Sequence, residues 1–151
     1  MRPTRRALAC AVVMIVSLLG PVAVAAPATA LNEGEKTRVL AIAKDLKGTP
    51  YRYGGTSPRS GFDCSGFTRY VFKKAKAGNL ERTAGAQMRQ GKSVKKNRKR
   101  KGDLVFFLNG GKAYHVGIYH SKGRIWHSPR TGQSVKLEKI WSSNYVVRRI
   151  R

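Results

Sequence analysis

The sequence predicts an α+β fold, with N-terminal helices packed on a central antiparallel β-sheet. Two stretches with apolar residues at helical spacing, residues 33–47 and 64–77, come first along the chain. Beyond Gly102 the pattern changes to short apolar segments bounded by Gly, Asn, Ser and Lys. Helices followed by successive strands with tight connections are typical of this class, whereas alternating strands and helices would indicate a parallel sheet.

The helices are bounded by recognisable signals. Gly48 and Pro50 end the first helix, and a loop rich in Gly, Pro, Ser and Tyr follows. The second helix is expected to begin at Cys64, with Asp63 as its N-cap. A shorter polar helix is expected over residues 83–90.

The second part of the chain is expected to form successive strands. We expect them at residues 104–108, 115–119, 124–127, 134–137 and 145–150. Between the second and third of them lies the turn 120–123. No internal repeat is visible, and the length allows one domain.

Residues 1–30 have the pattern of a signal peptide. Three arginines precede an apolar run over 7–19, which is shorter than the roughly 20 residues needed to span a bilayer. Cleavage is expected after Ala25 or, preferably, after Ala30, because polar sequence begins just beyond it. An uncleaved N-terminal anchor is the alternative. We therefore expect an exported protein, in the periplasm, the cell wall or outside the cell, with one domain over residues 31–151.

The expected mature chain is strongly basic. Of the 31 Lys and Arg, three precede Ala30, which leaves 28 against 7 acidic residues and a net charge of +21. Such a charge usually indicates nucleic-acid binding, but an exported chain meets anionic envelope polymers instead. We expect a monomer that contacts these polymers and no specific nucleic acid. The basic run 95–101 is expected to be an exposed loop with no catalytic role.

Cys64 is the candidate nucleophile. Cys10 lies within the predicted signal, so the mature chain has one thiol, which cannot form an intramolecular disulfide. A lone cysteine in an oxidising compartment is a liability unless it is buried or used. The alternative is a small buried apolar residue. At the first turn of a helix, unpaired backbone N–H groups and the helix dipole would favour a thiolate and could also hold an oxyanion.

A thiol nucleophile needs a base, and the available histidines are His115, His120 and His127. His120 falls in the predicted turn and is most simply a solvated residue. A three-residue loop over 121–123 would pair Gly117 with His127 and put His115 diagonally across from His127 on one face, whereas an even loop would put them on opposite faces. We expect His115 to accept the thiol proton and His127 to orient its ring.

Five motifs occur in an order that resembles the NlpC-type cell-wall endopeptidases. They are PYRYGG at 50–55, GFDCSGF at 61–67, RTA at 82–84 with Gln87, GDLVFF at 102–107 and HVGIY at 115–119. The resemblance covers nearly the whole expected mature chain. It implies a papain-like fold.

The resemblance also implies roles for individual residues. Cys64 would be the nucleophile, His115 the base and His127 the third polar residue. Tyr51 would lie near the nucleophile, and Asp63 and Ser65 would shape the substrate pocket. Members of the family hydrolyse peptide bonds in peptidoglycan stem peptides, commonly between D-glutamate and the diamino acid, through an acyl-enzyme.

Two other kinds of function are consistent with the sequence: a different reaction at the same thiol, and binding without catalysis. An amidase or an acyltransferase would use the same thiol, and a non-catalytic cationic protein would bind envelope polymers without it. No His/Glu motif with metal-ligand spacing and no nucleotide-binding glycine loop occurs, so we expect neither a metal nor another cofactor.

Overall fold

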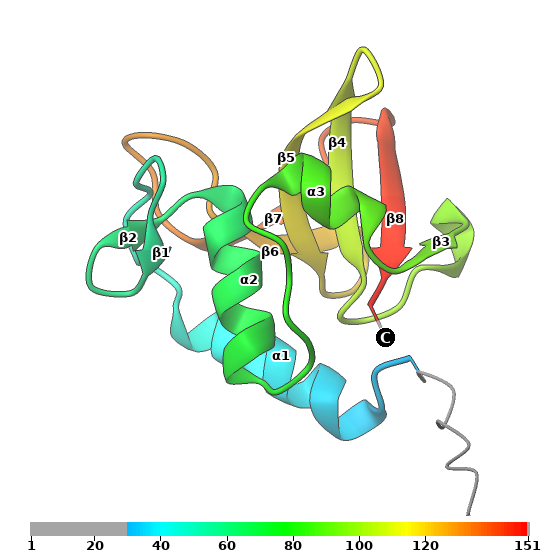
Figure 1. Ribbon diagram of the computed structural model, residues 1–151, viewed down its shortest axis with the longest axis horizontal. Coiled ribbons are helices and arrows are strands. Elements are labelled where there is room, and N and C mark those ends of the chain that lie inside the picture. Colours follow the sequence, from blue (N-terminus) through cyan, green and yellow to red (C-terminus); the bar gives the residue numbers. More distant parts are fainter. Residues whose placement is uncertain (1–29, 151) are drawn as a thin grey trace, which may run out of the picture.

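The computed structural model describes residues 30–150, and the α+β class is confirmed (Figure 1). These residues form three α-helices and a six-stranded antiparallel sheet, with a two-stranded hairpin beside them. The predicted signal peptide lies outside the described residues except for Ala30, and so does Cys10.

The helices begin where their capping residues predict. They are α1 (Glu33–Asp45), α2 (Cys64–Lys74) and α3 (Ala84–Arg89). Asn32 and Glu35 form a capping box at the start of α1. The predicted N-cap of α2 is confirmed, because an Asp63 carboxylate oxygen accepts a hydrogen bond from the Gly66 amide at 2.6 Å. Both α1 and α2 end two or three residues earlier than the apolar pattern indicates.

The strands match the predicted ones with four differences. They are β1 (Thr56–Ser57), β2 (Gly61–Phe62), β3 (Lys92–Val94), β4 (Leu104–Asn109), β5 (Lys112–Tyr119), β6 (Arg124–His127), β7 (Lys136–Lys139) and β8 (Tyr145–Arg149). The prediction missed the β1–β2 hairpin and β3, which are too short to carry an alternating pattern. It also placed β7 two residues too early and began β5 three residues too late. The large sheet has the order β3-β8-β4-β5-β6-β7.

The main core lies between the helices and one face of the sheet. Figure 1 shows α2 between the β1–β2 hairpin and the sheet, with α1 packed across it. Val71 and Phe72 of α2 pack with Phe106 and Val116 of the sheet, and all four are fully buried. Alternate residues point to the other sheet face, where Phe107 belongs to a smaller apolar cluster.

The connection between β5 and β6 has the predicted register. Ile118 pairs with Trp126, and the His120 amide donates to the carbonyl of Arg124 at 2.9 Å. Gly123 has the expected positive φ, 68°. Continuing this register by one residue puts Gly117 opposite His127, so His115 and His127 share one face of the sheet.

The basic run 95–101 is exposed along most of its length, as expected, and contains one turn of 3₁₀-helix, Lys96–Arg98. Arg149 of β8 anchors its C-terminal end, because its guanidinium binds the buried carboxylate of Asp103 at 2.8 Å and donates to the Arg98 carbonyl at 3.2 Å. Within residues 30–150, no helix combines the length and the apolarity that crossing a membrane requires.

Candidate active site

A cavity of about 540 Å³ opens beside the first turn of α2 and strands β5 and β6. Its lining contains four of the six residues that the sequence singled out: Tyr51, Cys64, His115 and His127. The other lining residues are Tyr114, Pro129, Arg130, Gln133, Lys136, Glu138 and Trp141. Asp63 and Ser65 are not part of this lining. The fold therefore brings one thiol and two imidazoles from three separate elements to the same cavity.

Cys64 is the first residue of α2 and is a free thiol. The backbone N–H groups of Val116, Ser65 and Cys64 itself lie close enough to its sulfur to stabilise a thiolate. Burial nevertheless outweighs them and raises the pKa of the thiol, with a further contribution from the negative charge of Asp63. The helix start does favour the thiolate, as expected, but desolvation is the larger effect in the free site.

The histidine pair, His115 and His127, makes a direct contact. His115 Nε2 lies 2.9 Å from His127 Nδ1, and the two rings are nearly perpendicular, at 88°. Both side chains are buried. They lie on the sheet face that carries Phe107, and Cys64 meets them because its sulfur lies next to Val116, the residue after His115. The diagonal arrangement predicted from the loop length is confirmed.

Burial keeps both histidines neutral. Burial, with a smaller contribution from the neighbouring His127, lowers the pKa of His115 to about 3. Burial also lowers the pKa of His127 to about 4, although the negative charge of Glu138 opposes that shift. These shifts favour a protonated thiol and uncharged imidazoles in the free site.

Glu138 is a polar residue of the site that the sequence prediction missed. One of its carboxylate oxygens lies 3.0 Å from His127 Nε2 and 3.1 Å from the ammonium of Lys136. Burial opposes ionisation of this carboxyl, but hydrogen bonds from Lys136 and His127 outweigh it and lower its pKa. The predicted strand ended at residue 137. A strand extended by two residues would have placed Glu138 beside β6.

Trp141 forms an aromatic wall against the histidine pair. Its ring stacks on Phe107 with centroids 3.9 Å apart and planes 5° apart. Its centroid lies 5.5 Å from that of His115 and 5.3 Å from that of His127. The side chain remains 48% exposed, so it both covers the imidazoles and presents an apolar surface to the cavity. No sequence pattern singled it out, because it lies in an irregular segment.

Tyr51 and Tyr53, two residues apart, have different environments. Tyr51 lines the cavity, and its amide donates to the carbonyl of Gln133 at 2.8 Å. Burial raises the pKa of Tyr51, and the nearby Cys64 raises it further, so its hydroxyl stays protonated and can donate a hydrogen bond. Tyr53 is 89% exposed and does not line the cavity.

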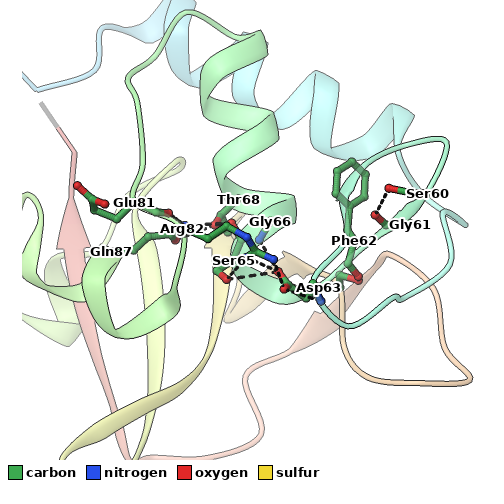
Figure 2. A network of polar contacts seen from close by, with 12 residues as sticks. Ser60, Gly61, Phe62, Asp63, Ser65, Gly66, Thr68, Glu81, Arg82 and Gln87 are labelled. Carbon is green, nitrogen blue, oxygen red and sulfur yellow. Dashed lines mark hydrogen bonds and ion pairs between the residues drawn. The ribbon is translucent and has the colours of Figure 1, made fainter.

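Asp63 is the centre of a polar network beside the site (Figure 2). Arg82 binds both of its carboxylate oxygens, at 2.6 and 3.1 Å. The carboxylate also accepts from the amides of Gly66 and Gly54, and Ser65 Oγ lies within 3.3 Å of it. This network fixes the first turn of α2 and so fixes Cys64. The sequence motif contained Arg82, but nothing in the sequence indicated its partner.

The helix packing behind the network depends on a buried glutamine. The side-chain amide of Gln87 donates to the carbonyls of Ser65 and Glu81, at 3.0 and 2.7 Å, and its oxygen accepts from Thr68 at 2.8 Å (Figure 2). Gln87 thereby ties α3 to the first turn of α2. Ser65 is buried, with its hydroxyl between Asp63 and Arg82.

The described residues offer no obvious metal centre. No group of three or more His, Cys, Asp or Glu among residues 30–150 is arranged to hold a metal ion. The cavity itself presents a thiol, two imidazoles and a carboxylate, which are groups that can take up a proton or attack a carbonyl carbon.

The chain matches known proteins over most of its described length. Residues 48–150 match the NlpC/P60 family. Murein DD-endopeptidase MepH of Escherichia coli K12 is 41% identical over 122 residues, which cover 74% of this chain and 45% of that protein. The gamma-D-glutamyl-L-lysine dipeptidyl-peptidase of Bacillus subtilis 168 is 41% identical over 117 residues, which cover 76% and 39%. The chain thus spans less than half the length of these two relatives.

Solved structures agree with the sequence match. The NlpC/p60 domain of the peptidoglycan hydrolase SagA superposes with a TM-score of 0.70 at 34% identity, covering 78% of this chain and 98% of that one. An NlpC/P60 protein of Bacillus cereus ATCC 10987 gives the same TM-score and identity, covering 82% and 41%. The papain-like fold expected from the motifs is confirmed.

Proposed function

The chain belongs to the NlpC/P60 family, and from that premise we propose that it is a cysteine peptidase that hydrolyses peptide bonds in the stem peptides of peptidoglycan. The observation that carries the proposal is the cavity in which Cys64 and the histidine pair meet. A thiol beside a neutral imidazole has the chemistry needed for nucleophilic attack on an amide.

Acylation begins with proton transfer. His115 is uncharged at neutral pH and its Nε2 is engaged with His127, so Nδ1 is the nitrogen left to take the Cys64 proton. As the sulfur attacks the scissile carbonyl carbon, the backbone N–H groups at the start of α2 stabilise the oxyanion. The carbon–nitrogen bond then breaks. His115 returns the proton to the departing amine, and a thioester on Cys64 remains.

Deacylation uses the same groups in reverse. His115 removes a proton from water, the hydroxide attacks the thioester carbonyl, and the carbon–sulfur bond breaks. The proton on His115 then returns to the Cys64 sulfur, which restores the neutral pair. The raised pKa of the free thiol is compatible with this scheme, because the sulfur can pass its proton to His115 as it attacks the carbonyl carbon and need not form a free thiolate first.

We propose that the scissile bond is the peptide bond between D-glutamate and the diamino acid. One relative carries that specificity in its name, whereas another is named for a DD-endopeptidase activity. The free carboxylate of D-glutamate would lie next to the scissile bond, and Arg130 provides an exposed positive charge at the cavity. We propose that Tyr51 contacts the substrate directly and that Asp63 and Ser65 shape its subsite together with Arg82.

We propose that residues 1–30 direct export and that the protein acts in the cell wall, the periplasm or outside the cell. The net charge of +21 on the expected mature chain would then hold it to anionic envelope polymers. The exposed basic run 95–101 would contribute nonspecific adhesion, which salt screens within about 10 Å at 0.1 M ionic strength. Replacing its lysines by glutamine should weaken binding to purified walls in low salt. Unchanged binding would remove this loop from the proposal.

The proposed peptidase activity is tested by incubating the protein with purified muropeptides and identifying the products by mass spectrometry. Hydrolysis after D-glutamate should give two fragments whose combined mass exceeds the substrate by one water. Cys64→Ala should abolish both fragments while leaving wall binding intact, and Ser121→Ala, in the distant β5–β6 turn, should leave them unchanged. Fragments that persist with Cys64→Ala would refute the thiol mechanism.

The same digest separates the alternative functions. An amidase would release intact stem peptides from the glycan, and an acyltransferase would join the acyl fragment to an added amine instead of to water. A non-catalytic envelope-binding protein would give no product at all. The three reactions give products of different mass and the fourth function gives none, so one experiment distinguishes all four.

A further inference from the structure

We propose that Glu138 is a positioning residue that sets the tautomers of the histidine pair, so that Nδ1 of His115 is unprotonated and can act as the base. The inference rests on the proposed function for its catalytic consequence. Its geometric basis is a hydrogen-bonded series of three side chains: Glu138 on β7, His127 on β6 and His115 on β5.

One hydrogen bond joins each side chain of this series to the next. Glu138 Oε2 lies 3.0 Å from His127 Nε2, and His127 Nδ1 lies 2.9 Å from His115 Nε2. Each imidazole nitrogen in these contacts therefore has one partner. Of the four ring nitrogens of the pair, His115 Nδ1 is the one that has no hydrogen-bond partner among residues 30–150, and its ring lines the cavity together with Cys64.

The positions of the protons follow from the carboxylate. An ionised carboxylate can only accept hydrogen bonds, so the proton must lie on His127 Nε2. A neutral imidazole carries one N–H, so His127 Nδ1 is an acceptor. His115 Nε2 must then donate to it, which leaves the lone pair of His115 on Nδ1. Glu138 thus determines the protonation of a ring that it does not touch.

The register between β6 and β7 brings the Glu138 carboxylate to His127. Lys136 of β7 pairs directly with His127 of β6, and Glu138 pairs with Ile125, two residues away on each strand. Side chains two residues apart share a face, so Glu138 and His127 meet diagonally. Lys136, 3.1 Å from the same carboxylate, favours its ionised form. The carboxylate side chain is 43% exposed, whereas the His127 ring is almost wholly buried.

Without the carboxylate, the opposite arrangement becomes available. His127 could carry its proton on Nδ1 and donate to His115 Nε2. The proton of His115 would then lie on Nδ1, where it blocks proton transfer from the thiol. In the Ser-His-Asp arrangement, a change that favours the wrong tautomer lowers kcat by about 10⁴-fold. We expect a smaller loss here, about 10-fold to 100-fold in kcat with little change in KM, because water can replace an exposed carboxylate.

The tautomers can be read directly from side-chain ¹⁵N chemical shifts at pH 7. The chain has three histidines, so the spectrum is simple. The unaltered protein should show the Nε2–H form for both members of the pair. Glu138→Leu should move a substantial fraction of both to the Nδ1–H form. Glu33→Gln, which alters an exposed carboxylate on α1, should leave the tautomers and the activity unchanged.

Glu138→Gln provides a second variant that preserves the side-chain shape. Its side-chain oxygen can accept a hydrogen bond from His127 Nε2–H, and its NH2 group can donate one to an unprotonated Nε2, so it should give a tautomer mixture and an intermediate kcat. If Glu138→Leu does not fold, this variant carries the test. A pair that stays Nε2–H in a folded Glu138 variant, or that is Nδ1–H in the unaltered protein, overturns the proposal.

The NMR result needs no substrate, so it is independent of the muropeptide digest. Products that persist with Cys64→Ala would remove the thiol peptidase function and leave the tautomer assignment intact. A tautomer change without loss of kcat would instead show that the tautomers do not control the rate, which overturns the catalytic role proposed for Glu138.

Discussion

The reactivity of Cys64 should rise continuously with pH up to pH 9. Burial raises the pKa of this thiol above its ordinary value of 9.0, and His115 is too weak a base to hold the proton, with a pKa of about 3. At pH 7 the ionised fraction of such a thiol is at most about 1%. Since the thiolate is the species that reacts, alkylation should accelerate about tenfold per pH unit between pH 5 and pH 8.

The measurement is the rate of iodoacetamide labelling, followed on the peptide that contains Cys64 by mass spectrometry so that Cys10 does not interfere. His115→Ala is the matched variant. An uncharged His115 contributes no positive charge to stabilise a thiolate, so removing it should change the labelling rate below pH 8 by less than about threefold.

A different profile would refute the reasoning. A thiolate–imidazolium pair would give a fast labelling rate that stays level from about pH 4 to pH 8 and collapses with His115→Ala. That result would mean that the N–H groups at the start of α2 and the histidine together outweigh burial. The resting site would then be an ion pair and not a neutral thiol beside two neutral imidazoles.

Acid should destabilise the fold, because the unfolded chain protonates the histidine pair near pH 6.5 whereas the folded pKa values are about 3 and about 4. Urea titrations should show a loss of roughly 2 kcal/mol per histidine between pH 7 and pH 5, and a flat profile would contradict it. Asp63→Ala removes the N-cap of α2 and the ion-pair partner of Arg82, so it should lower the free energy of unfolding by about 2–4 kcal/mol, measured by thermal unfolding. A loss below about 1 kcal/mol would mean that the Asp63 network does not stabilise the fold. Gly117→Ala would put a methyl group 2.7 Å from the Ile125 side chain, so it should cost about 1–3 kcal/mol and lower activity. Gly85→Ala adds a methyl group that would have no other atom within 4 Å, so it should instead stabilise α3 by up to about 1 kcal/mol. Equal effects of the Gly117 and Gly85 substitutions would refute the steric reasoning.

Local patterns were sufficient for much of the fold and of the site. The start of α2 at Cys64, its Asp63 cap and the β5–β6 register depend on short-range rules of capping and turn length. These rules by themselves place His115 and His127 on one face of the sheet. The nucleophile was identifiable because one thiol follows a capping residue, and the five ordered motifs identified the family.

The tertiary structure decided what depends on neighbours that are distant in sequence. Glu138 reaches His127 only through the β6–β7 pairing, and Arg82 reaches Asp63 only because the segment before α3 folds back over α2. The sign of the Cys64 pKa shift also came from the packed protein. A helix start favours the thiolate in any sequence, but desolvation depends on every atom that covers the sulfur, and no local pattern records that burial.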